Sequence, residues 1–519
     1  MTNLALRYSP DEVELYLVDF KKGVEFKTYV AHALPHARAI AIESDREFGV
    51  SVLQRLDAEM TRRGDLFRAA GVQDLPAYRA ATGQVLPRTL LVVDEFQVFF
   101  TEDDKLAQDA AILLDRLVRQ GRAFGIHVLL GSQTLAGTAG LARSTMGQMA
   151  VRIALQCSEA DSQLILDDTN VAARLLSRPG DAIYNDAGGL VAGNNSFQVA
   201  WLPDERQSAY LDEVHALAVA RGWRGEPAIV FEGNAPADMQ QNRLLARLIE
   251  TPRWPTSVAA PHAWLGEPVA IKDPTGVAFR RQSGANLLFV GQRDDAALAM
   301  LAAAMLCLGS QHAPQTARFV ILGGAAAGSP AAGGLQDVAA LLPHAIQWVD
   351  WRAVPDALAT LAAETQRRLA EGPEDAPAVY ILIYGLQRYR VLRRREETFS
   401  FSASDADAAP ATDRQFVEVL REGPALGLHV LVWSDTLATL ERTLDRQTQR
   451  EFDNRVLFQM SAADSSNLID SPEANRLGLY RALFFSEERG LLEKFRPYGT
   501  PDRDWLAHVR RCIERKAAG

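Results

Sequence analysis

The stretch TLLVVDEFQVFF (residues 89–100) carries two adjacent acids, Asp94 and Glu95, at the end of an apolar run. Carboxylates beside a buried strand lose hydration, so a cation or hydrogen-bond donors must compensate them. In α/β proteins ligands bind beyond the carboxyl ends of the strands, where these acids lie. An aspartate there can hold a magnesium ion through its water shell, and an adjacent glutamate can polarise an attacking water. The alternative is a pair of acidic loop residues after a strand.

A second polar signal ends the next apolar run, GIHVLLGSQT (residues 125–134), which carries Ser132 and Gln133 at its end. A glutamine beside an acidic strand can orient water or sense a γ-phosphate. The alternative is an ordinary polar strand end.

The elements that must position these side chains alternate along the chain. Four apolar runs predict buried strands, and two amphipathic stretches between them predict helices: residues 15–19, 89–96, 125–133 and 149–155 for the strands, and 50–63 and 107–121 for the helices. Such alternation with fully apolar strands is typical of an α/β fold whose parallel sheet is covered on both faces.

The chain repeats itself at offsets near 300 residues. Four motifs return in the same order: LPHA at 34–37 and 342–345, AEMTRR at 58–63 as AETQRR at 363–368, QGRAFGIHVLLGSQTLA at 120–136 as EGPALGLHVLVWSDTLA at 422–438, and CSEADSQLILDD at 157–168 as MSAADSSNLIDS at 460–471. We therefore predict two tandem copies of one domain, at 1–205 and 266–519, joined by a connector at 206–265.

The second copy has lost the acids of the first. Its apolar run AVYILIYG places Tyr384 opposite Asp94 and Gly385 opposite Glu95. Since the strand survives without carboxylates, the fold does not need them. The comparison favours a chemical role for the acids in the first copy.

Composition restricts the class of protein. The 519 residues carry a net charge of −10, which argues against a general polyanion binder. The three cysteines lie far apart and form no CxxC motif, which indicates a reducing compartment without disulfides. The longest apolar stretch, around 296–308, is too short to span a bilayer, and no signal peptide is visible. We expect a soluble cytoplasmic protein without a membrane segment.

Seven strings in this order resemble the motor domain of the FtsK/SpoIIIE group of the FtsK–HerA ATPases: LYLVDFKKGVEF, LPHARAI, AEMTRR, LPRTLLVVDEF, GRAFGIHVLLGSQT, VRIALQCSEADSQLIL and RPGDAIYN. The resemblance is close over residues 1–200 and more distant in the second copy. It implies two RecA-like P-loop NTPase domains, ATP with magnesium as cofactors, and a homo-oligomeric, hexameric ring that moves a polymer through its pore. By this resemblance Asp94 is the Walker B acid on the magnesium side, Glu95 the catalytic base and Gln133 the polar sensor.

The resemblance also suggests candidates for contacts outside the acid pair. Arg122 and Arg152 are candidates for an arginine that reaches the nucleotide of a neighbouring subunit, or else structural ion-pair partners. Lys21 and Lys22 follow a strand and are candidates for contact with a polymer or a phosphate, or else belong to a solvated turn.

A motor of this kind needs a glycine-rich loop with a lysine to cradle phosphates. In the second copy this loop should be GQRDDAAL (291–298), where Ala297 replaces the lysine and Leu298 the Ser or Thr. We predict that this degenerate copy does not hydrolyse ATP. In the first copy the repeat register places the loop ahead of Met1. We therefore expect the C-terminal part of a longer chain, which alone binds ATP poorly and is inactive.

The leading hypothesis is an ATP-dependent translocase that moves double-stranded DNA. One alternative is a type VII secretion motor of the EccC kind, whose substrate is protein. Another is a non-catalytic scaffold or regulatory module. Fold-level analogy alone favours DNA over protein.

Overall fold

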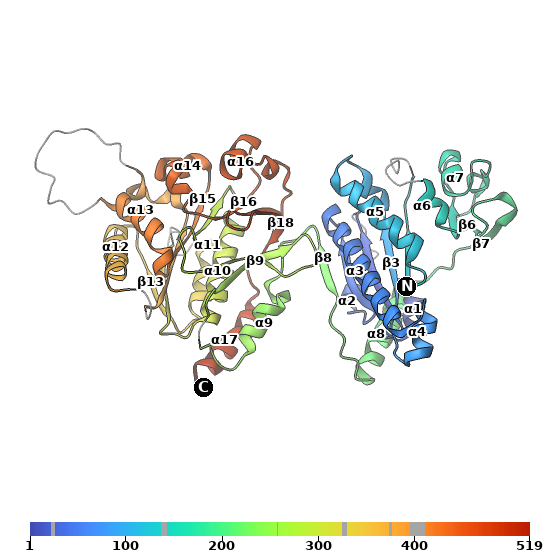
Figure 1. Ribbon diagram of the computed structural model, residues 1–519, viewed down its shortest axis with the longest axis horizontal. Helices are drawn as coiled ribbons and strands as arrows, with labels where there is room; N and C mark the ends of the chain where they lie inside the picture. The colour runs from blue at the N-terminus through green and yellow to red at the C-terminus, as the bar shows by residue number, and fades with distance from the viewer. Residues whose placement is uncertain are drawn as a thin grey trace, which may run out of the picture. The chain divides into compact units, whose positions relative to one another are not determined.

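The computed structural model describes residues 1–21, 26–135, 143–256, 258–323, 330–372, 376–394 and 411–518. It divides into two compact units (Figure 1). The first comprises residues 1–234 with 269–271, and the second comprises 235–268 with 272–519. The range 206–265, predicted as a connector, is shared between them. Its helix α8 (Asp204–Ala220) and strand β8 (Ile229–Glu232) lie in the first unit, and its helix α9 (Arg243–Glu250) lies in the second.

The first unit is built on a sheet of parallel strands in the order β4-β3-β1-β2-β8. Besides β8, these strands are β1 (Val13–Asp19), β2 (Ala37–Ile42), β3 (Arg88–Asp94) and β4 (Ile126–Leu130). Helices α3 (Arg46–Ala70) and α5 (Lys105–Gln120) pack on the face of β1 that carries Tyr16 and Val18. The other face, with Leu15 and Leu17, is covered by α1 (Thr2–Arg7), α2 (Lys27–Ala31) and α8.

A second, antiparallel sheet completes the first unit, in the order β5-β6-β7. Its strands are β5 (Arg152–Leu155), β6 (Asp181–Asn185) and β7 (Asn194–Gln198). Two short helices, α6 (Arg143–Gln148) and α7 (Glu159–Ile165), lie beside it (Figure 1). Helix α4 (Leu75–Thr82) packs instead against α3.

The second unit contains one continuous sheet in the order β10-β9-β18-β17-β16-β11-β15-β14-β12-β13. The parallel strands are β11 (Leu287–Val290), β12 (Ala317–Leu322), β13 (Ala345–Trp348), β14 (Ala378–Tyr384), β15 (Leu428–Ser434) and β16 (Asn454–Leu457). Antiparallel strands extend it: β9 (His262–Pro268), β10 (Thr275–Ala278), β17 (Ala482–Ser486) and β18 (Leu491–Pro497).

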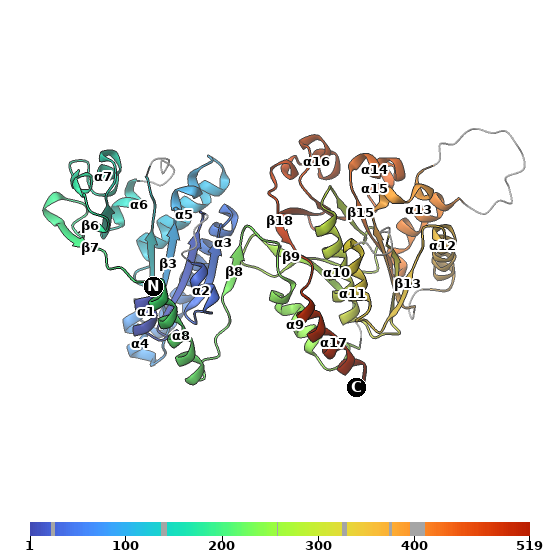
Figure 2. The ribbon, with the colours of Figure 1, turned by 180° about the vertical axis from the view of Figure 1, so that it is seen from behind.

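Two layers of helices cover this sheet, as both ribbon views show (Figures 1 and 2). One layer contains α9, α10 (Asp294–Gln311), α11 (Pro330–Ala339) and α17 (Arg503–Ala518). The other contains α12 (Val354–Glu371), α13 (Thr412–Glu422), α14 (Leu437–Thr443) and α16 (Ala462–Ile469), with the short α15 (Arg446–Gln449) near α13. Helix α10 is apolar around its circumference and almost entirely buried, as expected for a helix at the centre of a large core.

The two units repeat each other in side-chain detail. The buried Arg63 donates from Nε to Glu59 at 2.7 Å, and the buried Arg368 donates in the same way to Glu364 at 3.0 Å. These are the arginines of the repeated AEMTRR and AETQRR motifs. The prediction of two tandem α/β units with mainly parallel sheets is confirmed.

One part of the strand prediction is wrong. The runs 125–133 and 149–155 were expected to form buried strands, but Leu129 in β4 is 50% exposed and Ile153 in β5 is 47% exposed. The reason is topological: in the part of the chain that the structure describes, each of these strands lies at the end of its sheet. Apolar composition predicts a strand but not whether a neighbour covers it.

Candidate functional site

Two aspartates meet at the carboxyl edge of the first parallel sheet. Strands β1 and β3 are neighbours, and their last residues, Asp19 and Asp94, are register partners. Asp19 is 1% exposed, and its Oδ1 accepts a hydrogen bond from the backbone N–H of Lys21 at 2.8 Å. The fold therefore brings together at one edge two carboxylates that are 75 residues apart in the sequence (94 − 19).

Gly131 leaves room for the Asp94 carboxylate. Its N–H donates to the carbonyl of Val93 at 2.8 Å, and a Cβ added to Gly131 would lie 2.9 Å from Asp94 Oδ1. The neighbouring carboxylates of Asp19 and Asp94 fit a hydrated Mg²⁺, which proteins bind through one or two carboxylates together with substrate phosphates. Asp94 and Asp19 are the residues that would hold it.

Glu95 has an unusual backbone conformation. Its φ is 54°, in the left-handed region, and it precedes the 3-10 helix η1 (Phe96–Phe100). The equivalent residue in the second unit is Gly385, with φ of 87°. The position thus requires positive φ in both units, which glycine adopts readily and glutamate adopts at a cost. Strained non-glycine residues cluster at active sites, so the retention of glutamate favours a functional role.

Glu95 is 5% exposed as a residue, and its carboxylate has three partners. Lys21 Nζ lies 3.3 Å from Oε1, Gln97 Nε2 donates to Oε2, and the backbone N–H of Gln133 also donates. Burial by itself raises the pKa of Glu95, but the hydrogen bonds from these groups and the positive charge of Lys21 outweigh it, so the pKa lies below its ordinary value. Glu95 is therefore ionised at neutral pH and can accept a proton.

The contact of Gln133 with Glu95 is made by its backbone, and its side chain is exposed. Besides Lys21, the side chain that binds Glu95 is that of Gln97, which sequence reasoning missed. Ser132 Oγ in turn donates to Gln97 Oε1 at 2.7 Å. These contacts connect the ends of β3 and β4 through side chains.

Asp19 was also missed. A signal was present, because LYLVDF (15–20) ends an apolar strand in aspartate just as TLLVVDEF does. Gln97 gave no such signal, because its position depends on the turn of η1.

The structure separates the two arginine candidates. Arg152 donates to the carbonyls of Leu166, of Ile165 at 3.2 Å and of Met149 at 3.3 Å. Its counterpart Arg455 makes the same pattern of bonds to backbone carbonyls. A residue that serves both units alike is suited to a structural role.

Arg122 is exposed, and it lies before β4, at the opposite end of this strand from the acids. Lys21 belongs to the acid site, as described above. Lys22 lies outside the described residues.

The equivalent edge of the second unit is closed by aromatic side chains. Tyr384, at the position of Asp94, stacks on Trp433 with ring centroids 5.0 Å apart. The Arg388 guanidinium lies over the Tyr384 ring, 5.1 Å from its centroid. Trp433 Nε1 donates to the carbonyl of Gly291 at 2.9 Å, so the aromatic pair is tied to the degenerate loop.

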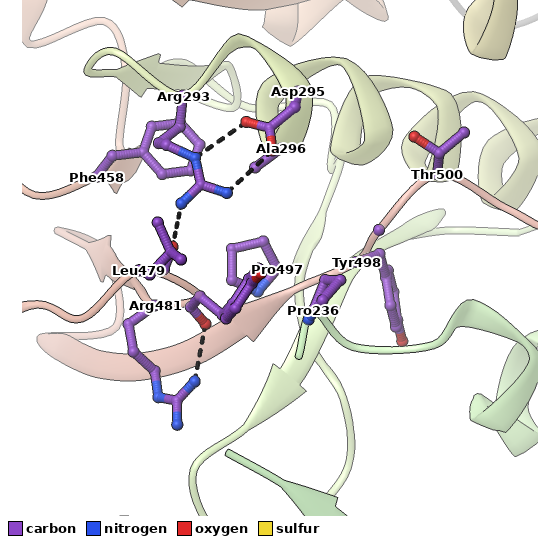
Figure 3. Close-up of a pocket in the computed structure, with 12 residues that line it drawn as sticks. Pro236, Arg293, Asp295, Ala296, Phe458, Leu479, Arg481, Pro497, Tyr498 and Thr500 are labelled. Atoms are coloured by element: carbon purple, nitrogen blue, oxygen red, sulfur yellow. Dashed lines mark hydrogen bonds and ion pairs between the residues drawn. The ribbon is translucent and has the colours of Figure 1, made fainter. Parts of the chain in front are cut away.

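Within the degenerate loop, residues 291–298, an arginine pairs with an aspartate of the same loop. Arg293 donates to the two carboxylate oxygens of Asp295, at 3.0 Å each, and to the carbonyl of Leu479. Figure 3 shows these bonds among residues that line a cavity of about 220 Å³. Asp294 and Asp295 form the first turn of α10, where a phosphate would otherwise meet the positive end of the helix dipole. The arrangement opposes phosphate binding.

Two features are absent from the described residues. No group of three or more His, Cys, Asp and Glu within them is arranged to hold a metal ion by itself. None of the helices they form is long and apolar enough to cross a membrane.

The model of the FtsK/SpoIIIE family matches residues 1–100. The ESX-5 secretion system protein EccC5 of Mycobacterium marinum is 29% identical over 183 residues, which are 33% of this chain and 13% of that protein. The DNA translocase FtsK of Oceanobacillus iheyensis is 29% identical over 225 residues, which are 41% of this chain and 27% of the translocase. The chain thus spans only a minor part of the length of these relatives.

Two solved structures align over almost the whole chain. The cytoplasmic domain of the type VII secretion ATPase EccC of Thermomonospora curvata aligns with 99% of this chain and 61% of its own, at 20% identity and a TM-score of 0.61. EssC (ATPases 2 and 3) of Geobacillus thermodenitrificans aligns with 96% of this chain and 87% of its own, at 15% identity and a TM-score of 0.57. These likenesses confirm the predicted tandem P-loop ATPase fold. With the family match over residues 1–100 and the two groups of relatives, they show that the chain is similar to the FtsK-type P-loop motor ATPases.

Proposed function

We propose that the first unit is the ATP-hydrolysing half of a motor that moves a polymer. The observation that carries this proposal is Glu95. It is buried, ionised, held in a strained conformation beside Asp94, and replaced together with Asp94 in the duplicate unit. A fold that does not need these acids keeps them only where they have chemistry to perform.

In this proposal each described residue has one task. Glu95 accepts the proton of a water molecule as the water oxygen bonds to the γ-phosphorus and the bond from that phosphorus to the departing ADP oxygen breaks. Gln97 and the backbone N–H of Gln133 orient the Glu95 carboxylate, and Asp94 together with Asp19 would hold a hydrated magnesium ion. Magnesium, when bound, neutralises the charge that develops on the phosphates.

The second unit is proposed to be regulatory and not hydrolytic. Its acid position is taken by Tyr384, and its loop is occupied by the pair of Arg293 and Asp295. The 519 residues contain no Gly-Lys dipeptide, the core of the phosphate cradle, so we expect these residues alone to bind ATP weakly.

For the cargo, we favour protein over DNA. Two secretion ATPases of known structure align with both units, over 96–99% of the chain, while in sequence EccC5 matches 33% of the chain and the FtsK translocase 41%. Double-stranded DNA remains the second candidate, supported by the identity to those translocases. We further propose a hexameric ring in the cytoplasm, in which the exposed Arg122 is available to a neighbouring subunit.

The test is ATP hydrolysis by the full-length gene product with magnesium. Glu95→Gln is expected to lower kcat by at least 10²-fold, the usual contribution of a general base. The matched control is Glu102→Gln, since Glu102 lies just after η1 with a side chain that is 63% exposed. Unchanged turnover in Glu95→Gln would remove Glu95 from the proposed role.

The cargo is tested with the same preparation. Stimulation of hydrolysis by the secretion-signal peptide of a co-encoded substrate, with no response to double-stranded DNA, supports a protein cargo. Stimulation by double-stranded DNA alone supports the second candidate.

A further inference from the structure

We infer that Asp161, in the first turn of helix α7, is a positioning residue for Glu95, because it fixes the loop whose backbone binds the Glu95 carboxylate. Its Oδ1 accepts a hydrogen bond from Thr134 Oγ1 at 2.9 Å and another from the Leu135 N–H at 3.0 Å. These two residues directly follow Gln133, whose N–H donates to Glu95. The inference rests on the proposed function, in which Glu95 is the general base.

The Asp161 carboxylate is itself held in place by the start of α7. Ser158 caps this helix: its Oγ accepts a hydrogen bond from the Asp161 N–H at 3.1 Å and donates to Asp161 Oδ2 at 2.7 Å. Both carboxylate oxygens therefore have partners. The bonds from Leu135, Ser158 and Thr134 outweigh burial and keep the pKa of Asp161 below its ordinary value. Asp161 is thus a charged acceptor at neutral pH, and bonds to a charged acceptor are stronger than bonds between neutral groups.

The loop that Asp161 holds has little packing of its own. Gln133 and Thr134 are exposed, and the next residue, Leu135, is buried. A loop that is exposed and held by few bonds moves readily, so the direction of the Gln133 N–H depends on the contacts of the residues beside it. Asp161 supplies two such contacts.

Asp161 also supports one of the side chains that bind Glu95. The Thr134 N–H donates to Ser132 Oγ at 3.3 Å, and Ser132 Oγ donates to Gln97 Oε1 at 2.7 Å. Gln97 Nε2 in turn donates to Glu95. Both groups that orient the carboxylate in the proposed function are therefore connected to Asp161 through one loop.

The second unit retains the aspartate of this arrangement. The repeated motifs make Asp464 the counterpart of Asp161, and Thr436 the counterpart of Thr134. Ser461 caps α16 and accepts a hydrogen bond from the Asp464 N–H at 3.1 Å, as the capping serine of α7 does. The start of the helix is therefore built alike in both units.

The contact between this aspartate and the loop is found in the first unit alone. In the described part of the second unit, Asp464 bonds to neither Thr436 nor Leu437. Thr436 Oγ1 instead accepts a hydrogen bond from the Thr439 N–H at 3.2 Å and caps α14. Gly385, at the position of the base, has no side chain to orient. The contact is kept where there is a carboxylate to position, which favours a role in the site over a role in the fold.

The test compares Asp161→Ala with Asp464→Ala, which changes the same position of the repeat in the second unit. Both aspartates lie in the first turn of a helix capped by serine, so an effect on the helix itself is matched. Loss of Asp161 should free the loop and weaken the bond from the Gln133 N–H to Glu95. In residues 1–519 the Gln133 amide should exchange with solvent about tenfold faster or more in Asp161→Ala, and at the parent rate in Asp464→Ala. Equal exchange in the two variants would overturn the inference.

ATP hydrolysis by the full-length gene product with magnesium gives a second readout. A misplaced base slows the chemical step and not the binding of ATP, so kcat should fall about tenfold or more in Asp161→Ala while KM stays near the parent value. The exchange readout involves no ATP, so a failure of the inference is distinct from a failure of the proposed hydrolysis. Faster exchange with an unchanged kcat would remove Glu95 as the base and leave Asp161 as the residue that positions its carboxylate.

Asp161→Asn separates position from charge. An asparagine keeps an oxygen that can accept the bonds from Thr134 and Leu135, so it should restore the slow exchange of the Gln133 amide and most of kcat. If Asp161→Asn lost as much activity as Asp161→Ala, the charge of the carboxylate would be what the reaction needs, and the positioning role would be overturned.

Discussion

Lys21 Nζ lies 3.3 Å from Glu95 Oε1, and the two side chains differ in exposure, at 56% for Lys21 and 6% for Glu95. The glutamate is thus buried while its cationic partner remains in water. Lys21 keeps most of its hydration and still favours the ionised form of the acid, an inexpensive way to hold a buried carboxylate charged. The sequence made Lys21 a candidate for contact with a polymer or a phosphate. In the structure Lys21 is also a partner of Glu95, the proposed base.

Replacing Lys21 with methionine should raise the pKa of Glu95, because one hydrogen bond and one positive charge are lost while burial remains. A carboxyl group whose pKa is lower in the folded chain than in the unfolded chain stabilises the fold at pH values above its unfolded-state pKa. This stabilisation is lost as the pH falls through the folded-state pKa. Lys21→Met should shrink that contribution. The measurement is carboxyl ¹³C titration of Glu95. Lys27→Met, which removes the exposed partner of Glu232, is the control and should leave Glu95 unchanged.

Gly131→Ala should displace the Asp94 carboxylate, because the new Cβ would lie 2.9 Å from Asp94 Oδ1. We expect magnesium-dependent hydrolysis by the full-length gene product to fall about tenfold or more, with little change in Tm. Gly64→Ala is the control, since its Cβ would meet only the Phe124 ring at 3.6 Å within helix α3. Equal hydrolysis in both variants would show that the position of Asp94 does not matter.

Arg152→Ala should lower the free energy of unfolding by about 2 kcal/mol, because backbone carbonyls lose their donor. Urea unfolding measures this loss, and Arg455→Ala should reproduce it in the second unit. Arg122→Ala, at an exposed position, should leave stability within about 0.5 kcal/mol. If Arg152→Ala unfolded like the parent protein while hydrolysis was lost, Arg152 would instead be a residue of the nucleotide site.

The second unit should lose stability between about pH 6.5 and pH 4. Burial lowers the pKa of His312 and of His429 from 6.5 to about 4, so the unfolded chain binds these protons first as pH falls. Stability is complete above pH 6.5 and decreases by up to about 3 kcal/mol for each histidine on reaching pH 4.

Urea unfolding at pH 7 and pH 5, followed by tryptophan fluorescence, measures this decrease. Six of the eight tryptophans lie in the second unit, so its unfolding dominates the signal. His312→Gln should reduce the pH dependence, and replacement of the exposed His215 by Gln should leave it intact. The same pH dependence in both variants would contradict the assignment to buried histidines.

Local sequence pattern and internal repetition predicted several strands and the acid pair of the candidate site. The apolar runs located β3 and β14 to within two residues, and the loss of carboxylates at Tyr384 and Gly385 singled out Asp94 and Glu95. The positive φ shared by Glu95 and Gly385 supports this alignment. Repeats are informative because a second copy under the same packing constraints separates what the fold needs from what the site needs.

Other features depended on contacts between distant segments. The register of β1 on β3 brings Asp19 beside Asp94, and the turn of η1 carries Gln97 to Glu95. Strand pairing is likewise what leaves Leu129 exposed in β4 while Leu431 is buried in β15. Composition and periodicity are properties of one segment, and so the sequence by itself determined the elements, the repeat and the acids. Register, burial and hydrogen-bond partners arise from the neighbours of a segment in space, and only the tertiary structure decided them.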